Sequence, residues 1–248
     1  IYPVGLPPKS KREKRAAAEA HLDAQLGVLD NFAGQPIFIP GNHDWYKYGV
    51  KGLDRQERYL EKRLNRGIED EDDEEWGNYF LPDQACSGPA VVKVNDQLVI
   101  IVIDSQWWLS NWDKVPNINE GCESLTRAAF AQAFKDAVRK NKVKNIVVAL
   151  HHPLYSNGIH GGKTTVKDHL FPLESLVNGL YLPLPGLGSI AQGLRATLGS
   201  RQDISNSFYR QMREDLLDPA ETHGEFIFVS GHEHNLQYFQ KRGQHFVV

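Results

Sequence analysis

Three short apolar runs in this sequence each lead directly into a loop that contains histidine. The pairs are residues 36–40 with Gly41-Asn42-His43-Asp44, residues 145–150 with His151-His152-Pro153, and residues 225–230 with Gly231-His232-Glu233-His234. The runs are rich in β-branched and aromatic residues, which is typical of strands. In open α/β sheets, binding sites gather at the carboxyl ends of the strands. The pattern therefore predicts a sheet with a polar site along one edge.

The remaining periodic segments complete a layered α/β domain with mixed sheets. Residues 90–94 and 98–104 read as two further strands, and Asn95-Asp96 between them reads as a hairpin turn. Helices are predicted over residues 11–29, 125–140 and 206–217, where apolar positions follow a helical period. The 248 residues, 41% of them hydrophobic, suit one globular domain with a substantial core.

Charge and cysteine content exclude several classes of protein. The formal net charge of −3 gives no general attraction to nucleic acid, so no nucleic-acid partner is indicated. Cys86 and Cys122 are the two cysteines, and no C-x-x-C motif is present. A cysteine-bound zinc site and a disulfide framework are therefore not indicated, although a single disulfide fits the sequence. Residues 69–75 form an acidic run that reads as a solvated loop.

The histidine loops offer side chains suited to a transition metal. Amide oxygen and imidazole nitrogen are ligands for zinc, iron or manganese, and Asn42, His151, His232 and His234 supply them. His232 and His234, two residues apart, point the same way if the chain is extended there. A closed structural zinc site is a poor alternative, because it needs four ligands and usually uses thiolates.

The three histidine motifs resemble three of the five motifs of the calcineurin-like metallophosphoesterase superfamily. Residues 151–156 and 231–238 are most similar to the tartrate-resistant, purple acid phosphatase branch. This resemblance implies a four-layer α/β/β/α sandwich of two mixed sheets and covers residues 1–248 as a single domain, apart from an irregular apolar insertion at 173–200. It also implies that the chain is truncated at both ends, since an Asp-x-His motif and a Gly-Asp-Asn motif would precede Ile1.

The resemblance further implies a dinuclear metal centre (iron, manganese or zinc) that hydrolyses phosphomonoesters. Asn42, His151 and His232 would bind one metal ion. Tyr2 and His234 would bind the other, together with aspartates that lie upstream, so the chain without them is expected to be inactive. The alternative function is a binding or scaffolding protein that has lost catalysis on the same fold.

His43 and Asp44 are the expected catalytic pair. His43 would stabilise charge on the phosphate or protonate the leaving oxygen, and Asp44 would keep its imidazole charged and oriented. The alternative for Asp44 is that it caps the following turn. His160 lies where related phosphatases place a substrate-facing histidine. His152 is grouped with it on the substrate side, with a supporting or packing role as the alternative.

The insertion at 173–200 contains Leu-Pro-Leu-Pro-Gly-Leu-Gly, which cannot form a regular helix or strand. We expect it to border the active-site mouth, with its leucines buried against the domain, a partner or a membrane surface. The acid-phosphatase resemblance favours export to the periplasm, the membrane or the exterior. Trp107, Trp108 and Trp112 are expected to pack in the core rather than to stack on substrate.

Overall fold

The computed structural model describes residues 4–68, 76–115, 117–158, 183 and 201–248. Tyr2, His160 and all of the 173–200 insertion except Pro183 lie outside these residues. The helices are α1 (Arg12–Leu26), α2 (Asn42–Trp45), α3 (Gly49–Leu64), α4 (Ser105–Leu109), α5 (Arg127–Lys140) and α8 (Ser207–His223), with short 3-10 turns at η1 (Gly27–Leu29) and η2 (Trp112–Lys114).

The strands form one mixed sheet in the order β1-β2-β3-β4-β6-β5. Their bounds are β1 (Ala90–Lys93), β2 (Leu98–Val102), β3 (Asn145–Ala149), β4 (Ile227–Val229), β5 (Tyr238–Lys241) and β6 (Gln244–Val247). The four central strands β2, β3, β4 and β6 are parallel, and antiparallel partners close both edges. The predicted mixed α/β fold is confirmed, and six strands of it lie in this sheet.

The first predicted strand, residues 36–40, is the exception. Within the described part of the chain it makes only an isolated parallel bridge, between Phe38 and Phe80. Phe38 N–H donates to Tyr79 carbonyl, and Leu81 N–H donates to Phe38 carbonyl. An apolar β-rich run forms a strand only where a neighbouring segment pairs with it over several residues. Here the pairing between Phe38 and Phe80 covers a single position, so no strand forms. The second sheet of the expected sandwich is therefore represented among the described residues by this bridge alone.

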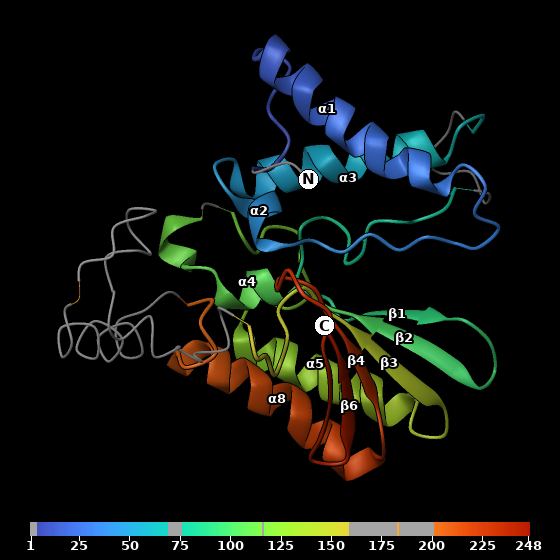
Figure 1. Cartoon of the computed structure of the whole chain (residues 1–248), viewed down its shortest axis with the longest axis vertical. Helices are drawn as coiled ribbons and strands as arrows, with labels where there is room; N and C mark the ends of the chain where they lie inside the picture. Colours follow the sequence, from blue (N-terminus) through green and yellow to red (C-terminus); the bar gives the residue numbers. More distant parts are fainter. Residues whose placement is uncertain (1–3, 69–75, 116, 159–182, 184–200) are drawn as a thin grey trace.

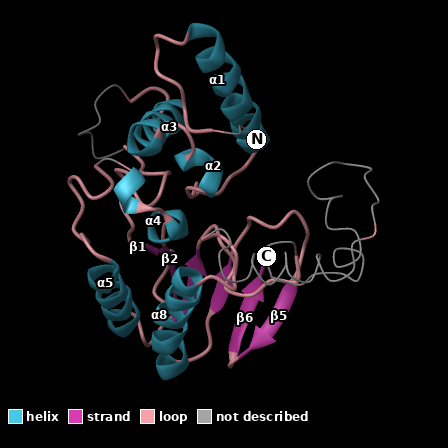
Figure 2. Cartoon of the chain, turned by 90° about the vertical axis from the view of Figure 1, so that its left-hand side faces the viewer, coloured by secondary structure: helices cyan, strands magenta, loops and turns pink. Residues whose placement is uncertain are grey.

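The helices pack in two groups around the sheet (Figure 1). Helices α5 and α8 lie side by side along one face, as Figure 2 shows from a second direction. Their apolar residues meet the strands in a core that includes the fully buried Phe130, Phe134, Phe228 and Phe246. Helices α1, α2 and α3 group together at the other end of the molecule (Figure 1).

Trp107 and Trp108 of α4 are fully buried, in agreement with core packing. The Trp108 indole N–H donates to Phe208 carbonyl at the start of α8, over 3.1 Å. The Trp112 ring lies 4.7 Å from that of Trp107. These contacts fix α4, which follows β2 directly, against the helical layer. The carboxyl end of β2 is thereby held in a rigid frame.

Cys86 and Cys122 form a disulfide bond. It links the segment before β1 to the segment between η2 and α5, across 36 residues of chain. The single disulfide that the sequence allowed is therefore present, and it ties together two segments that lack regular structure.

Candidate metal centre

Backbone hydrogen bonds carry the sheet into the two later histidine loops. Leu150 N–H donates to Val229 carbonyl over 3.1 Å, which extends the β3/β4 pairing by one step. Immediately beyond it, Gly231 N–H donates to His151 carbonyl, also over 3.1 Å. The two loops thus leave the sheet bound to each other, and their side chains start from neighbouring points.

The third loop reaches the same place through a close approach at Gly41. A methyl group added at Gly41 would lie 2.9 Å from Cε1 of the His151 ring. That distance is shorter than a carbon side chain tolerates, so only glycine lets the loop come this close. Asn42 follows at once as the first residue of α2, and its side chain is buried.

The side-chain ligand atoms of the three loops converge. His151 Nε2 lies 2.9 Å from Asn42 Oδ1 and 3.2 Å from His232 Nδ1. Ligands at about 2.1 Å from a tetrahedral metal ion lie roughly 3.4 Å from one another, by the geometry of zinc sites. The observed separations are close to that value, and the donor types suit the same ions. The residues present therefore fit a bound metal ion.

The backbone at His232 is in the left-handed region, with φ of 69°. Residues other than glycine seldom adopt this conformation, and when they do, they often lie at functional sites. At this position the unusual φ accompanies the turn of the imidazole toward His151. The chain is therefore not extended at His232, and the condition under which His232 and His234 would point the same way is not met.

His152 packs against the rings of His151 and His232 and is fully buried. Its ring centroid is 4.9 Å from that of His151 and 4.4 Å from that of His232. Nitrogen atoms of the three histidines lie within 4.8 Å of one another. A hydrogen bond of 2.9 Å joins His152 Nδ1 to Ser105 Oγ, which also accepts from the His152 backbone N–H. This burial matches the supporting role, and a substrate contact by His152 stays a prediction.

The carboxylate of Asp44 is held on both oxygens. Oδ2 accepts from Gly41 N–H and Oδ1 accepts from Gln56 Nε2, each over 2.7 Å. Burial raises the pKa of Asp44 above its ordinary value, and the hydrogen bonds from Gln56 and Gly41, then the nearby His43, oppose that rise. The bond to Gly41 reaches back to the start of α2 as a capping contact. Asp44 thus stabilises the loop that presents Asn42, whatever it also does for His43.

The buried carboxylate of Asp104 holds the same loop in place. Asp104 is fully buried at the end of β2, where Oδ2 accepts from the Trp45 indole N–H over 2.8 Å. Its Oδ1 accepts from the Trp107 backbone N–H over 3.0 Å and so caps α4. Burial raises the pKa of Asp104 to about 7. The α2 loop is therefore anchored to the sheet through one side chain.

Most of the predicted site residues line one pocket of about 480 Å³. Its lining includes Asn42, His43, His151, His232 and His234. His43 and His234 are exposed, whereas the three converging ligands are more enclosed. His43 and His234 therefore open toward solvent beside the ligand cluster.

Several residues of this arrangement were not predicted from the sequence. They are Ser105, Asp104 and Gln56, together with Tyr46 and Gln202, which contact the Asn42 amide. The sequence carries a weak signal only for Asp104, because an aspartate directly after a strand and before a helix is a typical N-cap. Tyr46 lies four residues after Asn42, and the remaining three act through spacings of 12 to 160 residues, which no local pattern reveals.

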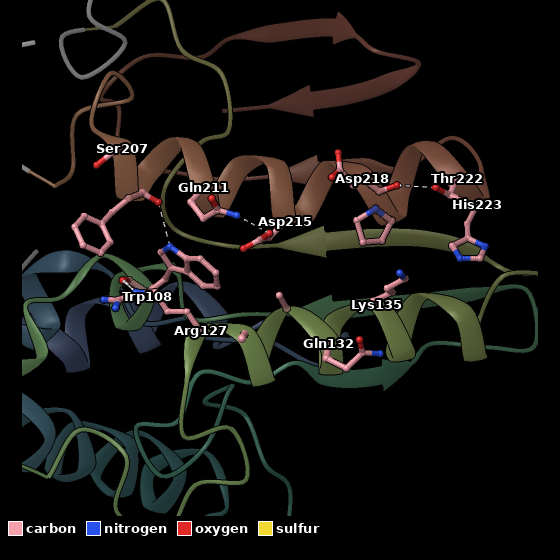
Figure 3. A pocket seen from close by; sticks show the side chains of 14 residues that line it. Trp108, Arg127, Gln132, Lys135, Ser207, Gln211, Asp215, Asp218, Thr222 and His223 are labelled. Atoms are coloured by element: carbon pink, nitrogen blue, oxygen red, sulfur yellow. Dashed lines mark hydrogen bonds between the residues drawn. The ribbon is translucent and has the colours of Figure 1, made fainter.

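A second hollow, of about 770 Å³, lies between α5 and α8 (Figure 3). Trp108 and Arg127 line one end of it, and Lys135 and His223 line the other. Arg127 donates to the carbonyls of Trp108 and Ser110, so its charge is used inside the fold. None of the predicted site residues lines this groove, and the chemistry predicted from the histidine motifs belongs to the smaller pocket.

None of the helices in the described part of the chain is long and apolar enough to cross a membrane.

Comparison with known proteins agrees with the site geometry. The family model for calcineurin-like phosphoesterases matches residues 14–244, which is nearly the whole chain. A search of curated proteins gives no match. The family match does not single out the purple acid phosphatase branch, but it does imply metal-dependent hydrolysis of phosphate esters. The chain is therefore a member of the calcineurin-like phosphoesterase family.

Proposed function

We propose that this protein is a dinuclear metal-dependent phosphomonoesterase of the acid-phosphatase type. The observation that carries the proposal is the convergence of Asn42 Oδ1, His151 Nε2 and His232 Nδ1, with separations of 2.9 and 3.2 Å. Metal ions held there would supply Lewis-acid polarisation of the phosphate and activation of the attacking water. His152 and Asp104, both buried beneath the loops, hold the site in shape.

The position of His43 supports its role as the general acid. It follows the metal ligand Asn42 directly, lines the same pocket and is exposed to solvent. A proton donated by His43 to the leaving oxygen would complete cleavage of the ester, a contribution worth roughly two to four powers of ten in rate. Asp44 is fixed by Gln56 and Gly41 and lends its negative charge to the adjacent imidazole.

A second metal position is proposed beside His234, with Tyr2 as its other ligand in this chain. The described chain begins at Val4, and Gly5 N–H donates to Tyr46 carbonyl over 3.1 Å. A methyl group added at Gly5 would lie 2.3 Å from the Asp44 carbonyl oxygen. The segment that follows Tyr2 therefore runs against the α2 loop, which supports placing the tyrosine near the site.

The disulfide between Cys86 and Cys122 supports a proposed exported location, because such bonds persist in oxidising compartments.

The test measures metal content and turnover of p-nitrophenyl phosphate in the full-length protein. We expect bound iron, manganese or zinc and metal-dependent hydrolysis, both lost in His232→Ala. The matched control is His223→Ala, at the last residue of α8 and outside the 480 Å³ pocket of the histidine loops, which should retain both. Metal binding without turnover of any phosphomonoester would refute the proposal and favour the binding-protein alternative.

A further inference from the structure

The amide of Asn42 must present its oxygen, and not its nitrogen, to a metal ion. The two ends of an amide have nearly the same shape, so hydrogen-bond partners decide which way it points. Asn42 Nδ2 donates to Tyr46 Oη over 3.0 Å and to Gln202 Oε1 over 3.2 Å. With both amide hydrogens taken there, Oδ1 is left facing His151.

Gln202 is itself oriented by its surroundings. Its Nε2 donates to Tyr46 Oη over 2.9 Å and to Gln106 Oε1 over 3.2 Å. The buried Gln106 is fixed in turn, because its Nε2 donates to Ser110 Oγ over 3.1 Å. If the side-chain amide of Gln202 were flipped, its N–H groups would face the N–H groups of Asn42. Its oxygen would then face Oε1 of Gln106. The network therefore fixes Gln202 Oε1 as an acceptor for Asn42.

The backbone near Gln202 is held in place independently of the metal site. Arg201 Nη1 donates to Ser110 carbonyl over 2.7 Å, and its guanidinium lies 4.2 Å from the centre of the Phe208 ring. These contacts fasten the segment ahead of α8 to the segment after α4. Gln202 can therefore act as a rigid support for a ligand 160 residues earlier in the chain.

We propose that Gln202, together with Tyr46, is a positioning residue that sets the amide of Asn42 for metal binding. The proposal rests on the metal-binding function proposed above and adds to it a support drawn from the chain immediately before α8. Residues that orient a metal ligand typically change affinity by about 10- to 100-fold when they are replaced. Neither Gln202 nor Tyr46 needs to touch the metal for this effect.

The experiment titrates Mn²⁺ into the full-length protein and into Gln202→Leu, which keeps the side-chain size but removes both hydrogen-bonding groups. We expect Gln202→Leu to weaken Mn²⁺ binding by about 10- to 100-fold. The control is Gln211→Leu, on the exposed face of α8, where the lost hydrogen bond goes to Asp215, and its Mn²⁺ affinity should equal that of the wild type. Thermal unfolding without metal separates a local change from loss of the fold.

The route through Asn42 is tested by a double-mutant cycle. In an Asn42→Ala background, Gln202→Leu should cause no further loss of Mn²⁺ affinity, because no amide remains to be oriented. Equal losses in both backgrounds would overturn the proposal, as would wild-type affinity in Gln202→Leu. Tyr46→Phe, which removes only a hydroxyl from an exposed ring, gives the same test if Gln202→Leu fails to fold. A wild-type protein that binds no Mn²⁺, iron or zinc would instead refute the proposed function.

Discussion

Glu57 makes the stability of this protein depend on pH, and the effect can be worked out from its surroundings. It lies on α3, and the residue is 7% exposed. Oε1 accepts from Gln84 N–H over 2.9 Å, and Oε2 has no hydrogen-bond partner among the described residues. Burial first, then the negative charges of Glu61, Asp83 and Asp54, raise the pKa of Glu57 from 4.5 to about 7.

The sign of the effect follows from that raised pKa. Below pH 4.5, Glu57 is protonated in both the folded and the unfolded chain and does not affect the balance. Between pH 4.5 and about 7 the unfolded chain releases this proton first, so the free energy of unfolding falls as the pH rises. Above pH 7 the loss in free energy of unfolding is complete. A rise in pKa of this size corresponds to a loss of at most about 3 kcal/mol.

Glu57→Gln removes the titration while keeping an oxygen to accept from Gln84. Chemical denaturation at several pH values should show the variant gaining stability over the wild type, by up to about 3 kcal/mol between pH 4.5 and 8. Glu13→Gln, on the exposed side of α1, is the control for removing a glutamate charge. Parallel stability profiles for the wild type and Glu57→Gln over this range would refute the reasoning.

Three further predictions concern the disulfide and the site. Replacing Cys86 and Cys122 together by serine should lower the free energy of unfolding by about 4 kcal/mol in urea denaturation, from the entropy of a loop spanning 36 residues. An unchanged midpoint would contradict this. Gly41→Ala should weaken Mn²⁺ binding at least tenfold with an unchanged far-UV circular dichroism spectrum, because the added methyl group displaces the His151 ring. Wild-type affinity for Mn²⁺ in this variant would contradict the prediction, because it would show that the loop can move away from His151. His43→Ala should lower kcat about a hundredfold or more with metal content intact, and metal loss would mean that His43 is a ligand.

The parts predicted well from the sequence are those with a local cause. Residues 98–104 and 145–150 contain buried strands because their apolar residues fill a sheet covered by helices, and the histidines that follow them must lie at its edge. Asn42, His151 and His232 could be chosen because their chemistry and their place after a strand agree. The structure brings these three together, while the predicted roles of His43, His234, Tyr2 and His160 await experiment.

The parts that were missed depend on distant contacts. Helix α3 was not predicted, because two glycines in its first turn, Gly49 and Gly52, and a highly charged sequence obscure its helical period. Gly52 is needed for packing, since a methyl group added there would lie 2.6 Å from Cβ of Tyr48 and 3.4 Å from Cα of Gly5. Helix α8 continues past residue 217 and includes Pro219, where tertiary packing outweighs the local preference to stop.

The spacing of the three proposed metal ligands along the chain has a consequence for how the protein folds and binds metal. Asn42 is 109 residues from His151, which is 81 residues from His232, so none of these contacts can form locally. Loop closure over such distances is slow, and it follows assembly of the sheet between β3 and β4. The unfolded chain therefore has no preformed metal site. Metal added during refolding should leave the rates of the early folding steps unchanged. It should act afterwards, by retarding the unfolding of chains that have already closed.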